Sequence, residues 1–172
     1  MTSTRTWKLP NPEPGRKKNA YGDLIAKPGE ANGVTFTSDD QPDGELIFVV
    51  SKITLDPKCV AGAAKSRRGH FLRIDLEVEP RDVSAESAEL WSSSFAAPSW
   101  VAYDAKGTAQ PGTDTEEAGG CLKSEEQLPY VDSRLIAKGT FVKGSVVLDV
   151  SSAKGTVVLD LNTDGGWEFQ YG

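Results

Sequence analysis

The chain has 172 residues, of which 38% are hydrophobic and 26% charged, enough for one globular domain and a tail. Its 19 basic and 25 acidic residues give a net charge of −6, which argues against a nucleic-acid partner held by phosphate neutralisation. His70, Cys59 and Cys121 are too few for the usual four-ligand zinc site. The glycines are scattered and form no phosphate-binding loop, so we expect no cofactor and no metal centre.

The N-terminal segment differs in charge from the remainder. Residues 1–37 hold six basic and three acidic residues, a net charge of +3, whereas the other residues carry −9. Four prolines and little apolar clustering indicate a segment that buries too little surface to offset its chain entropy. We expect a flexible basic linker rich in Pro and Gly over residues 1–32, and a folded domain over residues 33–172.

From residue 33 onward the hydrophobic period is two, which is typical of strands. In residues 70–79, Leu72, Ile74, Leu76 and Val78 alternate with charged residues, so one face is buried and the other exposed. The same criteria predict strands over residues 34–37, 46–55, 100–103, 135–142, 146–150, 157–161 and 167–171. The last three are separated by short turn-forming loops, which predicts a meander.

Only residues 83–91 have helical composition, with Ser84 as a candidate N-cap. No apolar run approaches the roughly 20 residues of a membrane span. The pattern predicts an all-β protein, an immunoglobulin-like antiparallel β-sandwich of about seven strands with at most one short helix.

The two cysteines both fall in predicted loops, away from the apolar strand positions. We expect a disulfide between Cys59 and Cys121 that links two long irregular segments, with two free thiols as the alternative. A disulfide implies an oxidising compartment, yet residues 2–8 contain no apolar stretch of a signal peptide. We expect an extracytoplasmic domain whose leader or membrane anchor has been removed. The alternative is a cytoplasmic protein with free cysteines and a native Met1.

Three stretches together resemble a known family. They are the alternating strand Leu72–Val78, the turn Asp104-Ala105-Lys106-Gly107, and Leu135–Gly139 followed by Gly144 and Val146–Val150. Residues 33–171 resemble the actinobacterial secreted or membrane-anchored immunoglobulin-like domains of unknown function, related to the mycobacterial secreted immunoprotective antigen. The resemblance implies a two-sheet sandwich, extracytoplasmic placement, and a binding or structural role without catalytic residues to carry over.

Three groups of residues are candidate sites. Asp39 and Asp43 suggest a weak calcium site, although the segment lacks the spacing of an EF-hand and is better explained as a turn. His70 is in phase with the apolar strand positions, which favours a strand-end residue over a catalytic base. Trp91 and Phe95 are candidates for an interface if they are exposed, because exposed aromatic residues are enriched at interfaces.

These observations lead to a first hypothesis of a non-enzymatic, extracytoplasmic module that binds a protein or a cell-envelope component. A carboxylate-based or metal-assisted hydrolase is the alternative from another class, since the chain has 25 acidic residues. A structural spacer domain is the second alternative.

Overall fold

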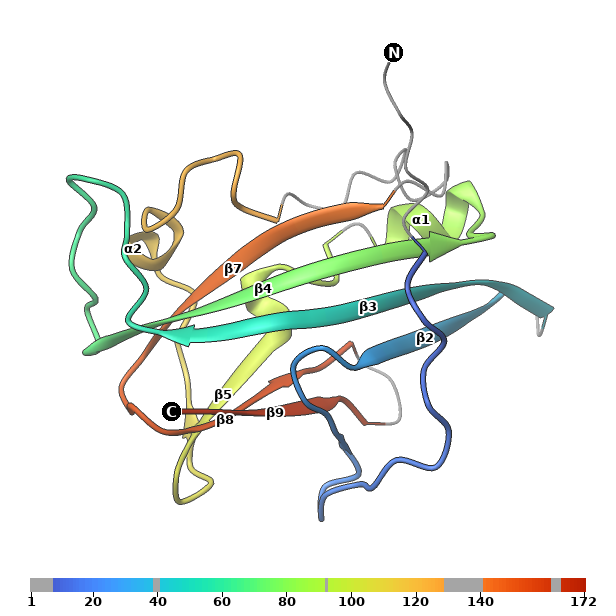
Figure 1. Ribbon diagram of the computed structural model, residues 1–172, viewed down its shortest axis with the longest axis horizontal. Coiled ribbons are helices and arrows are strands. Elements are labelled where there is room, and N and C mark those ends of the chain that lie inside the picture. The colour runs from blue at the N-terminus through green and yellow to red at the C-terminus, as the bar shows by residue number, and fades with distance from the viewer. Residues whose placement is uncertain (1–7, 39–40, 92, 129–140, 162–164) are drawn as a thin grey trace.

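The computed structural model describes residues 8–38, 41–91, 93–128, 141–161 and 165–172. Two sheets pack as layers with a hydrophobic core between them (Figure 1). The four-stranded sheet has the order β2 (Ala31–Ser38), β3 (Gln41–Leu55), β4 (His70–Arg81) and β7 (Val142–Val150). The five-stranded sheet has the order β1 (Leu24–Ile25), β9 (Trp167–Tyr171), β8 (Gly155–Leu159), β5 (Trp100–Asp104) and β6 (Ala109–Gln110).

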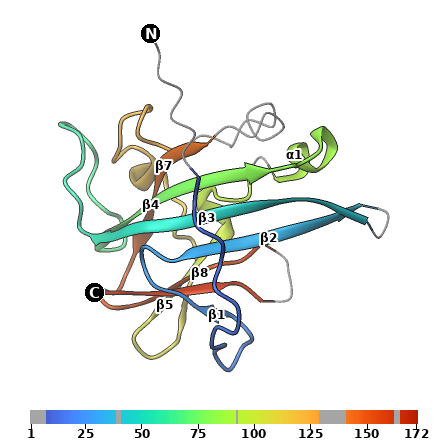
Figure 2. The same cartoon turned by 45° about the vertical axis from the view of Figure 1, so that its right-hand side comes forward.

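The all-β sandwich is therefore confirmed, with nine strands in the described part of the chain. All strand pairs are antiparallel except β1 with β9, which run parallel. The two layers are also distinct in Figure 2, where β2, β3, β4 and β7 lie on one side. The immunoglobulin-like strand order stays a prediction. Of the predicted strand over 135–142, residues 135–140 lie outside the described residues, and β7 begins at Val142.

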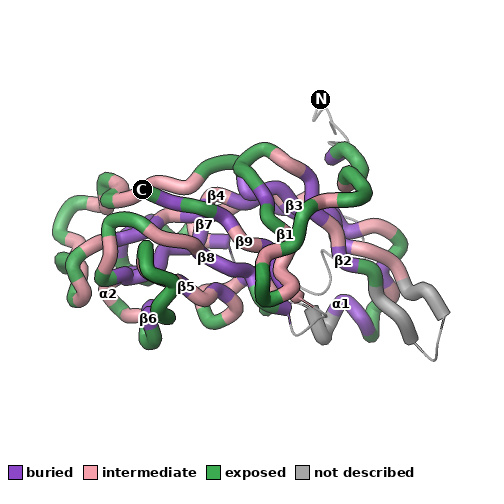
Figure 3. The backbone as a smooth tube through the Cα atoms, turned by 90° about the horizontal axis from the view of Figure 1, so that it is seen from below, coloured by how far each residue is buried: buried purple, intermediate pink, exposed green. Residues whose placement is uncertain are grey.

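The core follows from the alternation in the strands. Leu72, Ile74, Leu76 and Val78 on β4 are almost completely buried, as their period of two predicts. Figure 3 shows buried positions along the strands and exposed positions mainly in the loops. From the opposite sheet, the core receives Trp100, Val157, Leu159, Trp167 and Phe169. Burial of one such side chain contributes about 1.5–3 kcal/mol, so this interior supplies the main driving force for folding.

The predicted helix is present as α1 (Ala85–Trp91), and Ser84 caps it by accepting a hydrogen bond from the backbone N–H of Ser87 at 3.1 Å. The expectation of at most one short helix is wrong, because α2 (Glu116–Gly119) and a single 3₁₀ turn (Ala97–Ser99) are also present. The side chain of Thr115 accepts a hydrogen bond from the backbone N–H of Ala118 and so caps the first turn of α2. This helix has four residues, too few to produce a helical hydrophobic period in the sequence.

The predicted meander of the last three strands is wrong. β8 and β9 form a hairpin, but β7 pairs with β4 in the other sheet. The loop after β7 therefore crosses between the layers. Gln110 fixes this corner, because its Oε1 accepts hydrogen bonds from the backbone N–H groups of Ser151 and Ser152.

The expected flexible linker over residues 1–32 is also wrong for its described part, residues 8–32. Leu9 is buried, and its backbone N–H donates to the carboxylate of Glu79, which is itself buried. Arg81 donates to the carbonyl of Leu9 at 2.7 Å, and Arg16 donates to the carbonyl of Ala31 at 2.6 Å. Long-range hydrogen bonds thus hold a segment whose own apolar content is low.

Candidate functional site

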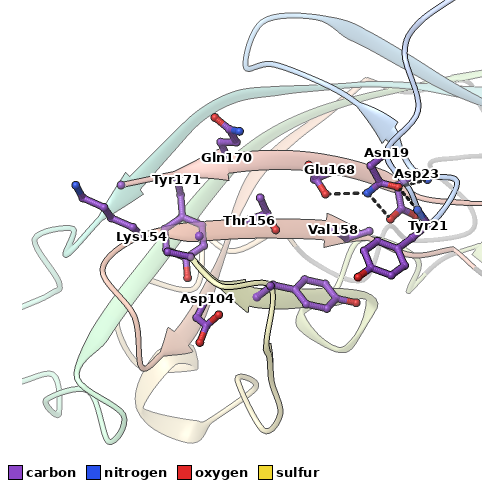
Figure 4. Close-up of a pocket in the computed structure, with 15 residues that line it drawn as sticks. Asn19, Tyr21, Asp23, Asp104, Lys154, Thr156, Val158, Glu168, Gln170 and Tyr171 are labelled. Carbon is purple, nitrogen blue, oxygen red and sulfur yellow. Dashed lines mark hydrogen bonds between the residues drawn. The ribbon is translucent and has the colours of Figure 1, made fainter.

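The candidate site is a groove of about 460 Å³ on the outer face of the five-stranded sheet (Figure 4). It arises from strand alternation in β8. Val157 and Leu159 point into the core, so Thr156 and Val158 face outward. Glu168 and Gln170 on β9 extend the same outer surface, and Tyr103 on β5 lines it from the other side.

One end of the groove is formed by the loop before β1, which carries Asn19, Tyr21 and Asp23. The Oδ1 of Asn19 accepts hydrogen bonds from the backbone N–H groups of Tyr21 and Asp23, each at 2.9 Å. Its Nδ2 donates to Asp23 Oδ2 at 3.0 Å and to Glu168 Oε2 at 2.8 Å. Asn19 therefore shapes the loop and also attaches it to β9, as the dashed lines in Figure 4 show.

This end of the groove combines aromatic rings with negative charge. Tyr21 is 89% exposed, which is unusual for a large hydrophobic side chain. Burial raises the pKa of the Tyr103 hydroxyl, and the nearby carboxylates Asp23, Asp160 and Glu168 raise it further. Asp23 and Glu168, which both line this end and are joined through Asn19, therefore give it negative charge.

The other end lies at the turn after β5, with Asp104, Lys154 and Tyr171 (Figure 4). Asp104 Oδ1 accepts from the backbone N–H groups of Lys106 at 2.8 Å and Thr108 at 2.9 Å. The hydrogen bond from Thr108 is the main cause of the lowered pKa of Asp104. Gly107 has φ +80° in this turn, the left-handed conformation that glycine adopts without strain.

Several polar groups in the groove are left without internal partners. Within the described part of the chain, no hydrogen bond is made by the hydroxyls of Tyr21, Tyr103 and Thr156, the amide of Gln170 or the ammonium of Lys154. The floor also contains Val158, which is apolar. The surface can therefore offer both ring faces and hydrogen-bonding groups to a ligand.

A second cluster of polar groups surrounds Asp149 on β7. Its carboxylate is completely buried and accepts hydrogen bonds from the Ser66 and Thr115 hydroxyls and from the backbone N–H groups of Arg67 and Arg68. Burial acts to raise the pKa of Asp149, but these hydrogen bonds outweigh it and lower the pKa overall. Asp149 thus joins the loop before β4 to the segment that contains α2.

The predicted disulfide is confirmed and joins the same two segments. Cys59 and Cys121 are 62 residues apart in sequence, with their Cα atoms 4.5 Å apart. Cys121 is completely buried among Phe71, Leu122 and Val147 on the outer face of the four-stranded sheet. The segment that follows Cys121 covers part of the free edge of β7, where Leu128 N–H donates to the Ser145 carbonyl at 2.8 Å.

The other candidate residues predicted from the sequence lie elsewhere. His70 begins β4, and its Nδ1 is 2.9 Å from Asp56 Oδ2, so it is a strand-end residue away from the groove lining. Asp39 lies outside the described residues, as does the side chain of Asp43, whose backbone is in β3. Within the described residues no cluster of three potential metal ligands is present.

The interface prediction is wrong for Phe95, which is completely buried. Its ring meets that of Phe48 with a centroid distance of 5.3 Å, and its carbonyl accepts from Trp100 Nε1 at 3.1 Å. Phe95 is therefore part of the core. Trp91 ends α1, but its side chain lies outside the described residues.

Sequence reasoning missed the groove. The alternation in residues 157–161 and 167–171 was itself the available signal, since it places Val158, Glu168 and Gln170 on one outer face. Asn19 and Tyr21 were missed because they fell in the segment predicted as a linker.

No family model, no curated protein and no solved structure matches this chain. The resemblance to the actinobacterial domains thus stays a prediction. No helix among the described residues is long and apolar enough to cross a membrane.

Proposed function

We propose that the protein is a non-enzymatic binding module that holds a protein or cell-envelope component in the groove between the Tyr21 loop and β5. The observation that carries the proposal is the set of polar and aromatic groups without hydrogen-bond partners among the described residues, on the outer face of the five-stranded sheet and on the loops at the two ends of the groove. Regular strands position such groups better than long loops, because packing beneath them fixes their backbone. The volume of about 460 Å³ lies within the range of ligand pockets.

The proposal places the module outside the cytoplasm. The support is the disulfide between Cys59 and Cys121, since disulfides persist in oxidising compartments and are rare in the cytosol. Intact mass measured on protein from the native cell, after alkylation without reduction, tests this placement. An unalkylated protein is expected, and two alkylated cysteines would contradict it.

Binding in the groove can be tested with arrays of synthetic peptides of varied charge and of cell-wall glycan fragments. The blocking variant is Thr156→Arg, which puts a long side chain into the groove from an outward position on β8. The matched control is Thr35→Arg, at an exposed position on β2 in the other sheet. We expect probes that bind the wild type and the control but lose at least tenfold in affinity for Thr156→Arg.

Two results would overturn the proposal. One is the absence of any bound probe on either array, which favours the spacer hypothesis. The other is equal binding by the wild type and Thr156→Arg, which would move the site away from the groove.

A further inference from the structure

The groove has unlike ends, and the difference has consequences for its ligand. The carboxylates of Asp23 and Glu168 both line the end formed by the Tyr21 loop, where Asn19 Nδ2 donates to each of them. The cationic Lys154 lies at the opposite end, beside Tyr171 (Figure 4). The lysine therefore does not neutralise the acidic end.

We infer that the Tyr21 end of the groove binds the side-chain cation of a lysine or arginine in an extended segment of a partner protein. This inference rests on the proposed function, which it deepens by naming the ligand class. The rings of Tyr21 and Tyr103 attract a cation because the quadrupole of an aromatic ring is negative at its faces. The carboxylates of Asp23 and Glu168 add direct electrostatic complementarity.

The geometry of the loop favours a preformed site. Asn19 Nδ2 holds one oxygen of Glu168, while Glu168 Oε1 makes no hydrogen bond within the described residues. Asp23 is fixed through both of its oxygens, since Oδ1 accepts from Gly166 N–H at 2.7 Å and Oδ2 from Asn19. The acidic groups are thus oriented before any ligand arrives, which lowers the entropic cost of binding.

The length of the groove favours a peptide segment over a small free amine. Its lining follows β8 from Gly155 to Val158, three steps of about 3.3 Å each and thus roughly 10 Å. A free amine would occupy only the acidic end. An extended segment would also contact Thr156, Gln170 and Lys154, whose side-chain polar groups lack partners within the described residues.

The test uses the whole chain and a short acetylated, amidated peptide, Gly-Ser-Lys-Ser-Gly. A second peptide carries norleucine in place of lysine, which keeps the aliphatic stem and removes the charge. A third probe is cadaverine, a free diamine. Binding is followed by ¹H–¹⁵N NMR, and we expect saturable shifts at residues 19–23, 156–158 and 168–170 with the lysine peptide, at least tenfold weaker for norleucine.

Two variants locate the cation. Glu168→Gln keeps an oxygen that can accept from Asn19 but removes the charge, and Tyr21→Ala removes an exposed ring. Each is expected to weaken the lysine peptide by about three- to thirtyfold, the size of a cation–π or charge contact. The control Glu125→Gln removes an exposed carboxylate outside the groove lining and should leave binding unchanged. Raising salt from about 0.1 to 1 M should also weaken binding, since the screening length falls from about 10 to 3 Å.

Each result has a distinct meaning. Equal binding of the lysine and norleucine peptides at the groove would contradict recognition of a cation, while the proposed function would still hold. Tighter binding of cadaverine than of the lysine peptide would contradict the inference that the ligand is an extended peptide segment. If the lysine peptide fails while a glycan fragment or neutral peptide shifts the groove resonances, only this inference fails. If no probe binds there, the proposed function fails with it.

Discussion

The Asp149 cluster and the groove are both rich in polar groups, yet they are built in opposite ways. Around Asp149, a completely buried carboxylate receives hydrogen bonds from four residues of two separate segments. In the groove, several hydroxyl, amide and ammonium groups make no hydrogen bond within the described residues. Buried polar groups must be satisfied internally, whereas a site for a ligand needs groups that only water satisfies before binding. The difference separates a structural cluster from the groove for which we propose a role in recognition.

Removal of the disulfide beside the Asp149 cluster is the change with the largest expected effect on stability. Replacing both Cys59 and Cys121 by alanine should lower the free energy of unfolding by about 2–5 kcal/mol, because the unfolded chain regains the freedom of a long loop. Urea denaturation of the variant and the wild type measures the loss. The groove should still bind its ligand under conditions where the variant is folded. Loss of binding by the fully folded variant would show that the two regions are coupled.

Asp149→Asn is expected to have the next largest effect and to lower the free energy of unfolding by about 1–3 kcal/mol. An amide cannot accept all of the hydrogen bonds that the carboxylate accepts. The exposed neighbour Asp114→Asn is the matched control. Urea denaturation of all three proteins at neutral pH measures the difference. A loss no larger than that of the control would contradict the structural role of Asp149.

The same carboxylate predicts a pH dependence. Its pKa in the folded chain lies below that of an unfolded aspartate, about 3.9. Its contribution to stability is therefore complete above that pH and is lost as the pH falls through the folded pKa. The stability difference between wild type and Asp149→Asn should shrink from pH 6 to pH 3 in urea titrations. A constant difference over this range would contradict the assignment.

On the groove side, Asn19→Ala should cost about 1 kcal/mol of stability, because its hydrogen bonds are partly exposed to water. The substitution should destabilise the Tyr21 loop more than the rest of the fold. Amide hydrogen exchange at residues 20–24 should accelerate while exchange in β4 stays unchanged. Lys17→Ala, at an exposed position in the same segment, is the control and should change neither.

The smallest effect is expected for Tyr21→Ala. Because 89% of this residue is exposed, the unfolding free energy should change by no more than about 0.5 kcal/mol. Thermal or urea denaturation checks this expectation. A loss above 1.5 kcal/mol would mean that Tyr21 supports the fold, and its effect on peptide binding would then need to be read against that loss.

The sequence predicted those features whose cause is local. Alternation at Leu72, Ile74 and Leu76 directly encodes which face of β4 is buried, and Ser84 encodes the start of α1. The pairing of Cys59 with Cys121 followed from there being only two cysteines, both expected in loops. Each of these inferences needs only the residue types and their spacing.

The features that were missed depend on contacts between distant residues. A short polar loop after β7 suits either a hairpin or a crossing between sheets, and Gln110, some 40 residues away, fixes the choice. Phe95 lies in a stretch of small polar residues, so only the neighbouring Phe48 and Trp100 show that it is buried. Asn19 likewise has no local pattern that predicts its contact with Glu168.

The hydrogen bond between Asn19 and Glu168 joins residues 149 positions apart, and β1 pairs with β9 beside it. Closing a contact between such distant residues carries the entropic cost of a long loop. The groove is therefore complete only when β9 has joined the sheet, because Glu168, Gln170 and Tyr171 of its lining lie on β9. A nascent chain of about 160 residues, or a chain cleaved before β9, would lack part of the groove lining. We therefore expect ligand binding to report completed folding of this chain.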